Sequence, residues 1–511
     1  MTVPTADLTR LDDPRGVAQI LASLEQDVPT SAESAPEPQR LSMYGASFEV
    51  HDAGDEQEPQ VFSKNHRRYP RVPLQGKVRF GLDDGPRAGL VDINASGFSA
   101  RIHPTAAERL PSYGWVEIDL GHARVCGYAR LRRQYALGHH VVLGFELEPD
   151  RERSEIIRSI LDRAYPAIMP RADLPAAAVA RLLDESGYLE LCEDGQLPDD
   201  WLGFRSPESF DLVSLGDDAT PLAHLSITKA FSTTWVAHQL ASRSKHHESF
   251  WSWYQLHRYL ACMPAMMDGE NAHVVAYYNP AQPYHQRYLR AFGSWMQSEA
   301  DVSIAQYSMF HLDAASNDVG AASLVSGWSV TPLTSAARPD VHRVVLQNLS
   351  PLVARAFDLA PVTLESVNLT RDPYSLLNRK RRVFLLWHDG RVQAVALCER
   401  GASSVSIFGL FDLVQVLPTR DGFVAPQAAL GMLMDAVRGF YRAEGAERAL
   451  VFAPIGCMIA EAHPALEYSH VVERFIMGGR ALRHYENFVR YTFGRAARAV
   501  GRKMKWKADH Q

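Results

Sequence analysis

Arg67-Arg68-Tyr69-Pro70-Arg71 is followed, in one strand-rich part of the chain, by Asp92-Ile93-Asn94-Ala95-Ser96-Gly97. Arginine presents a planar fork of donors to phosphate oxygens. Arg67 and Arg71, four positions apart on an irregular segment, can therefore clamp two phosphates, or one phosphate and a guanine edge. The alternative is a solvated basic loop followed by an ordinary turn, because Asp, Asn, Ser and Gly all favour turns. We favour a local site for a compact, doubly charged phosphate ligand.

The sequence around these two stretches predicts a small antiparallel barrel. Short runs of alternating or β-branched character are separated at regular spacing by Gly, Pro and Asp clusters, which is typical of small all-β barrels. The runs cover 77–80, 89–92, 115–120, 123–131 and 140–147. A helix is expected at 151–165, where four isoleucine and leucine residues have helical spacing and two prolines follow.

The stretch from about 62 to 166 resembles a PilZ domain, the bacterial receptor module for cyclic di-GMP. Arg67 and Arg71 match the RxxxR motif of that family. Asp92, Asn94 and Gly97 occupy the places of its D/NxSxxG motif, with Asn94 where the family usually has serine. The resemblance implies a barrel domain at 61–166 that binds cyclic di-GMP.

The same resemblance implies a role for each motif residue. The arginines would bind phosphates and guanine edges, and Asp92 and Asn94 would hold a guanine. Asparagine keeps an acceptor and adds two donors, so a hydrogen bond at position 94 can survive the replacement of serine. Gly97 would allow the backbone to approach closely. The predicted ligand-binding residues are Arg67, Arg68, Arg71, Asp92, Asn94 and Gly97.

The composition indicates a globular, multidomain protein. The 511 residues predict two to four domains. Hydrophobic residues make up 46% of the chain and charged residues 22%, which is ordinary for a soluble protein. The net charge of -6 argues against a generic nucleic-acid binder, which normally carries a basic excess. No nucleic acid is therefore expected as a partner.

The cysteines and the N-terminus favour a cytoplasmic protein. The five cysteines are widely scattered without a CxxC spacing, which indicates reduced thiols and no zinc site. The first residues lack the basic start and apolar run of a signal peptide. No stretch approaches the roughly 18 apolar residues that a transmembrane helix needs.

The two ends of the chain carry opposite charge. Residues 1–60 hold twelve Asp and Glu against three Arg with few aromatics, so we expect this segment to be largely disordered. Residues 495–511 form a basic amphipathic tail. It is a candidate for peripheral contact with anionic lipid or an acidic partner, and a frayed solvated terminus is the alternative.

The region 167–511 predicts α/β layers, because helical and strand-like runs alternate along it. Helices are expected at 176–185, 250–263, 283–296, 345–357 and 426–444. Strands are expected at 272–278, 382–387, 392–400, 405–413 and 448–453. The dipeptide Asp389-Gly390 predicts a hairpin between the second and third of these strands.

Two parts of this region share a plan, a helix that leads through a turn to a strand, at 250–278 and at 426–453. This suggests two related half-domains, at 167–345 and 346–494. The order of hairpin, strand, long helix and closing strand resembles the GNAT acyltransferase superfamily. The predicted fold is therefore a small β-barrel followed by a tandem GNAT-like α/β region.

The cofactor loop of that superfamily is not reproduced. GNAT enzymes place an R/QxxGxG/A loop before the long helix, where backbone amides hold the pyrophosphate of coenzyme A. Here Gln427 and Gly431 are present within Pro426-Gln427-Ala428-Ala429-Leu430-Gly431, but the full pattern is not. An acyl-coenzyme A, another acyl carrier or no carrier remain alternatives, and the catalytic residues are unassigned.

Other chemistry-bearing residues have simpler interpretations. Glu399 is a candidate base, but a solvated carboxylate beside Arg400 is favoured. Tyr485 is a candidate acid, but packing is favoured. His246, His247 and His257 lack acidic partners at ligand spacing, so no metal site is predicted. An aromatic cluster is expected to be core, and it comprises Trp235, Trp251, Trp253 and Tyr254.

These observations lead to one function with two alternative outputs. The protein is expected to be a cyclic di-GMP receptor whose PilZ domain regulates a GNAT-like N-acyltransferase region. The alternative is a non-catalytic adaptor, responsive to cyclic di-GMP, whose C-terminal region binds a protein partner.

Overall fold

The computed structural model describes residues 71–81, 85–150, 152–170, 173–187, 209–215, 220–243, 247–280, 286–316, 325–364, 379–402, 409–419, 425–457, 459 and 463–489. The predictions made for the acidic segment 1–60 and the basic tail 495–511 lie outside these residues.

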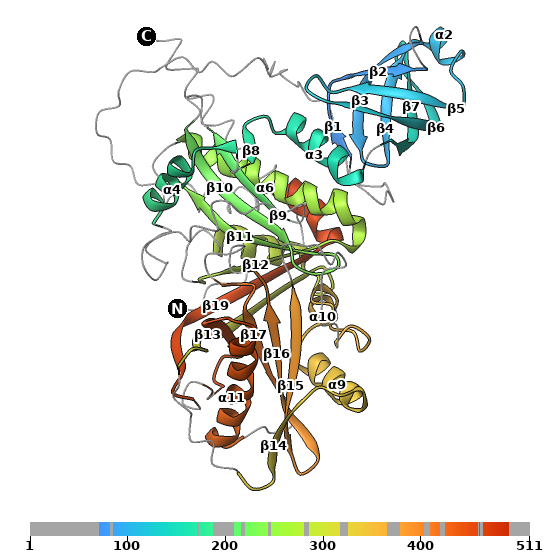
Figure 1. Ribbon diagram of the computed structural model, residues 1–511. Helices are drawn as coiled ribbons and strands as arrows, with labels where there is room; N and C mark the ends of the chain where they lie inside the picture. Colours follow the sequence, from blue (N-terminus) through green and yellow to red (C-terminus); the bar gives the residue numbers. More distant parts are fainter. Residues whose placement is uncertain are drawn as a thin grey trace, which may run out of the picture. The chain divides into compact units, whose positions relative to one another are not determined.

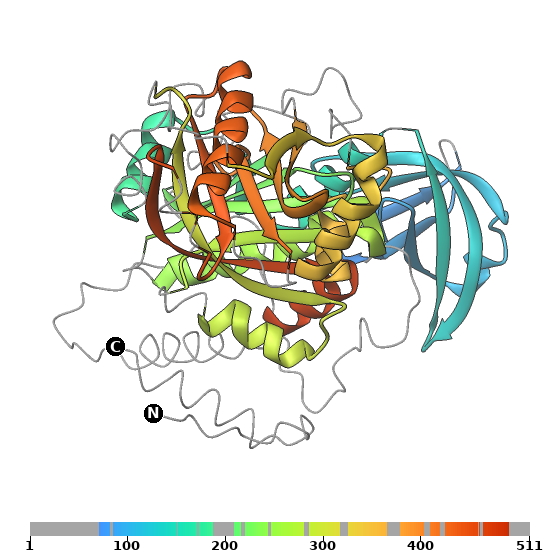
Figure 2. The ribbon, with the colours of Figure 1, turned by 90° about the horizontal axis from the view of Figure 1, so that it is seen from below.

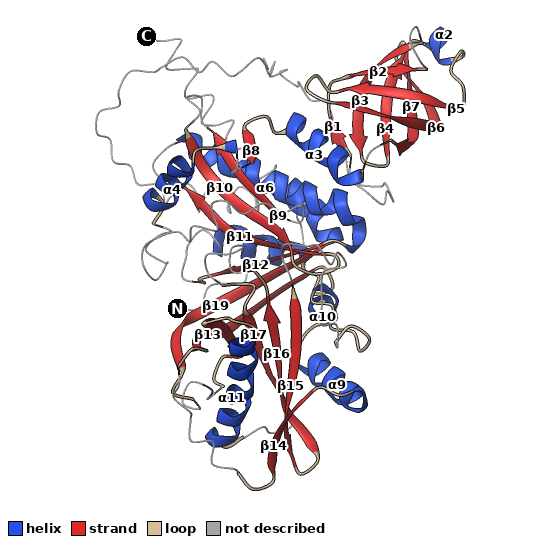
Figure 3. Cartoon of the chain, in the orientation of Figure 1, coloured by secondary structure: helices blue, strands red, loops and turns tan. Residues whose placement is uncertain are grey.

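Seven strands at the start of the described chain form the predicted antiparallel barrel (Figures 1 and 3). They are β1 (Val72–Pro73), β2 (Lys77–Phe80), β3 (Arg87–Asn94), β4 (Gly97–Ile102), β5 (Tyr113–Asp119), β6 (Arg124–Leu137) and β7 (His140–Pro149). The strand order is β1-β3-β2-β5-β6-β7-β4, and pairing of β3 with β4 closes β2 to β7 into a ring. Closure leaves β1 as a short addition to β3.

Alternating apolar side chains fill the barrel. Phe80, Phe98 and Phe145 meet at its centre, with ring centroids 5.1 Å apart for Phe80 and Phe145 and 4.9 Å apart for Phe98 and Phe145. Each belongs to a different strand, so their contact ties the two sides of the ring together. The short helix α2 (Pro104–Ala107) connects β4 to β5.

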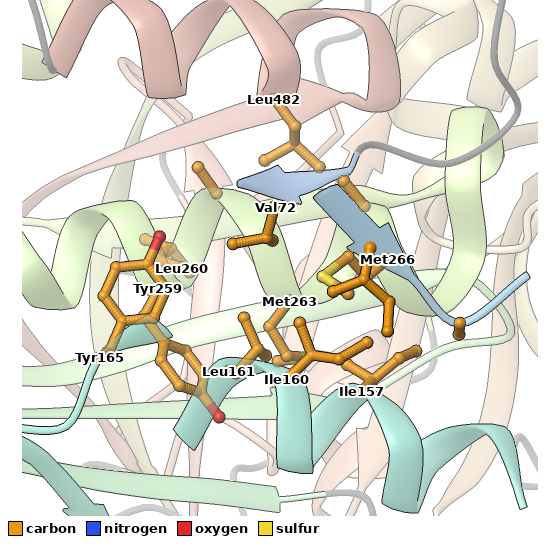
Figure 4. Packing of buried hydrophobic residues seen from close by; sticks show 14 of the residues in the cluster. Val72, Ile157, Ile160, Leu161, Tyr165, Tyr259, Leu260, Met263, Met266 and Leu482 are labelled. Carbon is orange, nitrogen blue, oxygen red and sulfur yellow. The ribbon is translucent and has the colours of Figure 1, made fainter. Parts of the chain in front are cut away.

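Helix α3 (Arg153–Ala164) follows the barrel and confirms the helix predicted at 151–165. Its buried face packs against α6 (His247–Asp268), which lies far along the chain. Val72 of β1, Ile157 of α3, Met263 of α6 and Leu482 belong to one hydrophobic cluster (Figure 4). The barrel and the following region are therefore joined through a common apolar core, which we call the joint.

A second sheet of twelve strands occupies the rest of the described chain. Its strands are β8 (Ile168–Pro170), β9 (Ser209–Leu215), β10 (Pro221–Lys229), β11 (Thr234–Ser242), β12 (His273–Tyr278), β13 (Val302–Asp313), β14 (Trp328–Pro332), β15 (Lys380–His388), β16 (Arg391–Arg400), β17 (Leu413–Pro418), β18 (Arg448–Pro454) and β19 (Leu466–Gly478). Their order in the sheet is β14-β15-β16-β17-β18-β13-β19-β12-β11-β10-β9-β8.

This order contains the same unit twice. In the first half β11 leads through α6 to β12, and the two strands are parallel. In the second half β17 leads through α11 (Gln427–Ala443) to β18, and these strands are also parallel. The two related helix-to-strand stretches predicted from the sequence therefore occupy equivalent places in the sheet.

The last strand of each unit crosses to the other one. β13 follows the first unit but pairs with β18 of the second, and β19 follows the second unit but pairs with β12 of the first. β13 and β19 then pair with each other in the middle of the sheet (Figures 1 and 2). Exchange of these strands makes one continuous sheet from the two units.

Helices cover both faces of the sheet. Helix α6 packs against one face of β10 to β12, and α11 packs against the same face in the second unit. Helices α9 (Arg338–Asn348) and α10 (Pro351–Ala356) pack on the opposite face and contact strands of both units. The remaining described helices are α4 (Ala176–Glu185), α8 (Ala291–Met296), the 3-10 helices η3 (Gly269–Asn271) and η5 (Ser335–Ala337), the π-helix η4 (Gln286–Arg290), and residues 479–489.

The single helix expected at 345–357 is wrong. Helix α9 ends at Asn348, Leu349 is extended, and Ser350 caps the new helix α10 by accepting a hydrogen bond from the amide of Val353. The break arises because Pro351 lacks an amide hydrogen and disfavours helical geometry in the residue before it. Apolar residues at helical spacing occur in both α9 and α10, which is why the sequence suggested a single helix.

Two other predicted boundaries differ from the structure. Residues 409–412 form a turn, with Gly409 in the left-handed region at φ 63°, and β17 begins only at Leu413. The strand predicted at 405–413 is therefore wrong at 409–412, and its residues 405–408 lie outside the described ranges. The helix predicted at 283–296 comprises η4 and then α8 within the described residues. The predicted hairpin is confirmed, because Asp389 and Gly390 both have positive φ between β15 and β16.

In the described part of the chain, no helix is both long enough and apolar enough to span a bilayer. Four of the five cysteines are described, and no disulfide joins any two of these four.

Candidate functional site

A short strand brings Arg71 to the second motif. Val72 pairs with Ile93 and Pro73 with Asp92 in the antiparallel β1–β3 ladder. Arg71 immediately precedes this ladder, so its side chain reaches the end of β3 although 21 residues separate it from Asp92. Arg71 and Asp92 of the predicted site are therefore in direct contact.

The Arg71 guanidinium is held by three hydrogen bonds. Nη1 donates to Asp92 Oδ1 at 2.8 Å and to the Ser99 hydroxyl at 2.6 Å, and Nη2 donates to the Phe145 carbonyl at 3.3 Å. Nε is buried and has no hydrogen-bond partner among the described residues. Because arginine has five donor hydrogens, the three bonds fix its orientation and leave donors for a ligand.

Asn94 shapes the tight turn between β3 and β4. Its Oδ1 accepts a hydrogen bond from the Ser96 amide at 3.0 Å and one from the Ser96 hydroxyl at 3.1 Å. Only 4% of Asn94 is exposed. This arrangement is an Asx turn, in which a side-chain oxygen replaces a backbone acceptor. The side-chain oxygen of Asn94, which takes the place of a serine hydroxyl, therefore accepts hydrogen bonds within the turn.

Gly97 stands where no side chain fits. Asn94 pairs with Gly97 across the turn, and Gly97 pairs with Glu146 of β7 on its other side. A Cβ at position 97 would lie 2.3 Å from the Phe145 carbonyl oxygen and 3.0 Å from Arg71 Nη2. Glycine is therefore required by the close approach of β7 and of the arginine that the site depends on.

Sequence reasoning missed two further members of this site. Ser99 is 1% exposed, accepts from Arg71, and also accepts from Arg133 Nη2 at 3.4 Å. Arg133 lies at an irregularity of the β6–β7 ladder, opposite Gly144. A Cβ at Gly144 would lie 2.5 Å from Arg133 Nε. Ser99 lies two residues after Gly97, so it shares a face with Gly97 if both are on a strand. This could have identified Ser99 as part of the site only if β4 had been recognised as a strand.

The structure thus brings together four of the six predicted residues, Arg71, Asp92, Asn94 and Gly97. Arg67 and Arg68 lie outside the described residues. Whether any of the six binds a ligand stays a prediction.

Gly97→Ala is expected to lower the free energy of unfolding by about 1–3 kcal/mol, because the added methyl must displace the Phe145 backbone or Arg71. Displacing Arg71 should also weaken nucleotide binding at least about tenfold, the equivalent of 1.4 kcal/mol. Urea unfolding and calorimetric titration measure the two effects. Gly89→Ala on the neighbouring strand β3 is the matched control, since its Cβ would meet only Arg101 O at 3.9 Å.

A second region of interest lies where parallel strands separate. β17 and β18 pair at three positions, the last joining Gln415 to Phe452, and both strands then continue unpaired with each other. β11 and β12 pair only from Thr234 to Ala237, and Gln239 of β11 has φ 56° in a buried position. Each unit therefore contains a fork between parallel strands.

The two candidate catalytic residues, Glu399 and Tyr485, are buried. Glu399 is 6% exposed and hydrogen-bonds Arg381 Nε at 2.6 Å and Arg379 Nη2 at 3.4 Å, so its interpretation as a solvated carboxylate is wrong. The Tyr485 hydroxyl lies 2.7 Å from His257 Nδ1 in the core, and burial raises the pKa of Tyr485. A phenol so buried is held in its protonated form.

The aromatic cluster agrees with its simpler interpretation, a place in the core, where it is described. Trp235, Trp253 and Tyr254 are buried in the core that includes α6, whereas the Trp251 side chain and His246 lie outside the described residues. Within the described chain, no group of three or more His, Cys, Asp or Glu side chains is placed to hold a metal ion. Gln427 and Gly431 lie inside α11, and residues 420–424 before it are outside the description.

Comparison with known proteins gives structural matches only. A GCN5-related N-acetyltransferase from Sphaerobacter thermophilus is 13% identical, with TM-score 0.33, over 61% of this chain and 96% of that one. A tandem GNAT protein from the clavulanic acid biosynthesis pathway is 13% identical, with TM-score 0.32, over 61% of this chain and 98% of that one. YcgR of Escherichia coli, solved in complex with c-di-GMP, is 19% identical, with TM-score 0.17, over 19% of this chain and 45% of that one.

No model of a protein family matches the chain, and no curated protein matches its sequence. The first two of these structures are GNAT proteins, and the third is a complex with c-di-GMP.

Proposed function

We propose that the barrel binds cyclic di-GMP and that binding regulates the GNAT-like region that follows it. The observation that carries the proposal is the position of Arg71, whose guanidinium is held against Asp92 and Ser99 beside Gly97, where the absence of a side chain lets the arginine approach the backbone closely. A fixed guanidinium beside a carboxylate offers complementary partners to a phosphate and to the donor edge of a guanine.

The nucleotide would bind to hydrogen-bond donors and acceptors that the contacts within the barrel do not use. Arg71 keeps the second hydrogen of Nη2 as a donor for a phosphate oxygen, and Arg67 and Arg68, four and three positions earlier, would supply further cationic donors. Asp92 accepts one hydrogen bond from Arg71, and a carboxylate has room for several. Binding therefore does not require the Arg71–Asp92 pair to break.

Regulation of the GNAT-like region is supported by the packing of Val72, the residue that follows Arg71. Val72 belongs to the joint, together with residues of α3, α6 and the helix at 479–489. Arg153 of α3 also donates to the Met266 carbonyl of α6 at 2.8 Å. A ligand that moves Arg71 acts directly on β1, and any differential affinity for two positions of β1 would shift the packing on α6.

The output that we favour is acyl transfer to an amine, because the chain retains two strand forks in a GNAT-like order. The alternative output, a non-catalytic adaptor, is favoured by the missing R/QxxGxG/A pattern before α11. The two alternatives differ in one measurable property, the binding of an acyl carrier.

Hydrogen exchange of the full chain with and without cyclic di-GMP tests the proposal. We expect slower exchange at 71–73 and 92–99, where the nucleotide binds, and a change in α3 and α6, where the joint lies. In Arg71→Ala both effects should disappear. Unchanged exchange in the barrel would refute binding, whereas a change confined to the barrel would refute regulation through the joint.

A third arm adds acetyl-coenzyme A and discriminates the outputs. Slower exchange at β17, β18 and the start of α11 would support the acyltransferase. No change at these elements, with or without cyclic di-GMP, would support the adaptor.

A further inference from the structure

Arg474 is a buried cation in the middle of the twelve-stranded sheet. On β19 it pairs with Tyr277 of β12 and with Ala305 of β13, so these side chains share one face of the sheet. Tyr307, two residues beyond Ala305, lies on the same face. This is the face on which α9 and α10 pack.

Aromatic rings surround its guanidinium. Arg474 Cζ is 4.9 Å from the ring centroid of Tyr307 and 5.3 Å from that of Phe357. Only 2% of Arg474 is exposed, and its Nε has no hydrogen-bond partner among the described residues. Cation–π contacts offset part of the desolvation of the charge, but they satisfy no N–H donor.

The described residues offer Arg474 no carboxylate. Its chain neighbour Glu473 has its side chain on the opposite face of the sheet, where Arg290, Gln306 and Tyr278 bind it. Glu399 is bound by Arg379 and Arg381, two further buried cations. A buried charge is normally paired, because the free-energy cost of desolvating it exceeds the free energy gained by packing it.

A second buried donor on this face lacks an acceptor. Gln415 of β17 is 7% exposed, and its Nε2 has no hydrogen-bond partner among the described residues. Gln415 pairs with Phe452 at the last paired position of the β17–β18 fork. The Phe452 ring stacks on Tyr307 with centroids 6.1 Å apart, so a row of rings leads from Gln415 to Arg474.

Buried donors without acceptors are uncommon in folded proteins, and two of them along one aromatic row leave a place for an acceptor that the described residues do not supply. Water can accept hydrogen bonds from both groups, but it does not neutralise the guanidinium. An anion does both.

We propose that Arg474 is the anchor of a binding site for a small-molecule monocarboxylate, whose apolar body lies along Tyr307 and Phe452 toward Gln415. A carboxylate is the favoured anion because its two oxygens match the planar fork of one arginine. A phosphate would bring two charges to a single unpaired cation among aromatic rings. The proposal is independent of nucleotide binding by the barrel.

The test compares melting temperatures of the full-length protein, without nucleotide, in hexanoate, benzoate, hexanamide and inorganic phosphate at matched ionic strength. Hexanoate and benzoate should raise the wild-type melting temperature with rising concentration. Hexanamide, which lacks the charge, and phosphate should not. Arg474→Met should abolish the carboxylate effect, and Gln415→Leu should weaken it.

The unliganded variants give a second, independent readout. Arg474→Met should raise the melting temperature, because it removes an unpaired buried charge and keeps the volume of the side chain. Arg381→Met is the contrast, since it removes a buried arginine that is paired with Glu399 and should lower the melting temperature. Arg474→Lys keeps the charge without the fork and should weaken hexanoate binding at least tenfold.

The proposal is overturned if no carboxylate stabilises the wild type, or if hexanoate stabilises Arg474→Met equally. It is also overturned if phosphate alone stabilises the protein, since the site would then take a different anion. An Arg474→Met variant that fails to fold or melts earlier than the wild type would show that the guanidinium is a structural group.

Discussion

Arg71→Ala is expected to weaken binding of cyclic di-GMP by at least about 100-fold, the equivalent of roughly 3 kcal/mol. The substitution removes a guanidinium that the barrel holds in place, together with the charge-assisted hydrogen bonds that it would make to a phosphate, each worth about 1.5–3 kcal/mol. Calorimetric titration of the full chain measures the loss. The affinity of Arg71→Lys for cyclic di-GMP should lie between those of the wild type and Arg71→Ala, because lysine keeps the charge but not the planar fork.

Arg87→Ala is the matched control. Arg87 lies at the start of β3, the strand that carries Asp92, and it is exposed. Its removal changes the net charge of the barrel as much as Arg71→Ala does, so an affinity within about a factor of two of the wild type would separate a specific contact from general electrostatic attraction. Equal affinities of Arg71→Ala and the wild type would eliminate the proposed nucleotide site.

The barrel could be predicted largely because its information is local. Short alternating runs and turn residues mark each strand, and the motif residues lie at strand ends. β4 was not predicted, because Gly-Phe-Ser-Ala-Arg-Ile has little alternation of polarity and follows a turn signal directly. Its inward residues become clear only from pairing with β7, whose paired residues lie 39 to 49 positions away.

The twelve-stranded sheet was predicted less completely, for the same physical reason. The units β11–α6–β12 and β17–α11–β18 are local, and their helices and closing strands were expected from sequence. The exchange of β13 and β19 depends on pairing between distant segments, and the residue pattern within either strand does not indicate which strand it pairs with. β10 was also missed, because His224, Ser226 and Thr228 place buried polar groups on one of its faces.

The candidate site shows the same division. Arg71 and Asp92 were recognisable as residue types suited to a nucleotide, but their contact depends on the two-residue strand β1. The burial of Glu399 was not recognisable, because its partners are distant in sequence, Arg381 in β15 and Arg379 just before that strand, and its chain neighbour Arg400 suggested a solvated pair. Arg400 instead binds Asp412 at 2.7 Å.

Glu399→Gln is expected to lower the free energy of unfolding of the α/β region by about 3–5 kcal/mol. Glutamine keeps the shape of the side chain but removes the charge that faces two buried guanidinium groups, whose side chains are 0% and 2% exposed. Burial already lowers the pKa of Arg379, and the Glu399 carboxylate opposes that shift, so its loss leaves the cation less compensated. Urea unfolding, followed by circular dichroism, measures the change.

Glu444→Gln supplies the matched control for this carboxylate. Glu444 hydrogen-bonds Lys380 Nζ at 2.6 Å in a pair whose side chains are 34% and 27% exposed. Solvent screens such a pair, and its loss should cost no more than about 1 kcal/mol. A Glu399→Gln protein as stable as the Glu444→Gln protein would contradict the structural role, and would return Glu399 to consideration as a base for acyl transfer. A large loss of stability would instead mean that Glu399 holds β15 and β16 together across two buried arginines, so that its removal says nothing about catalysis and the base must be sought elsewhere along the strand forks.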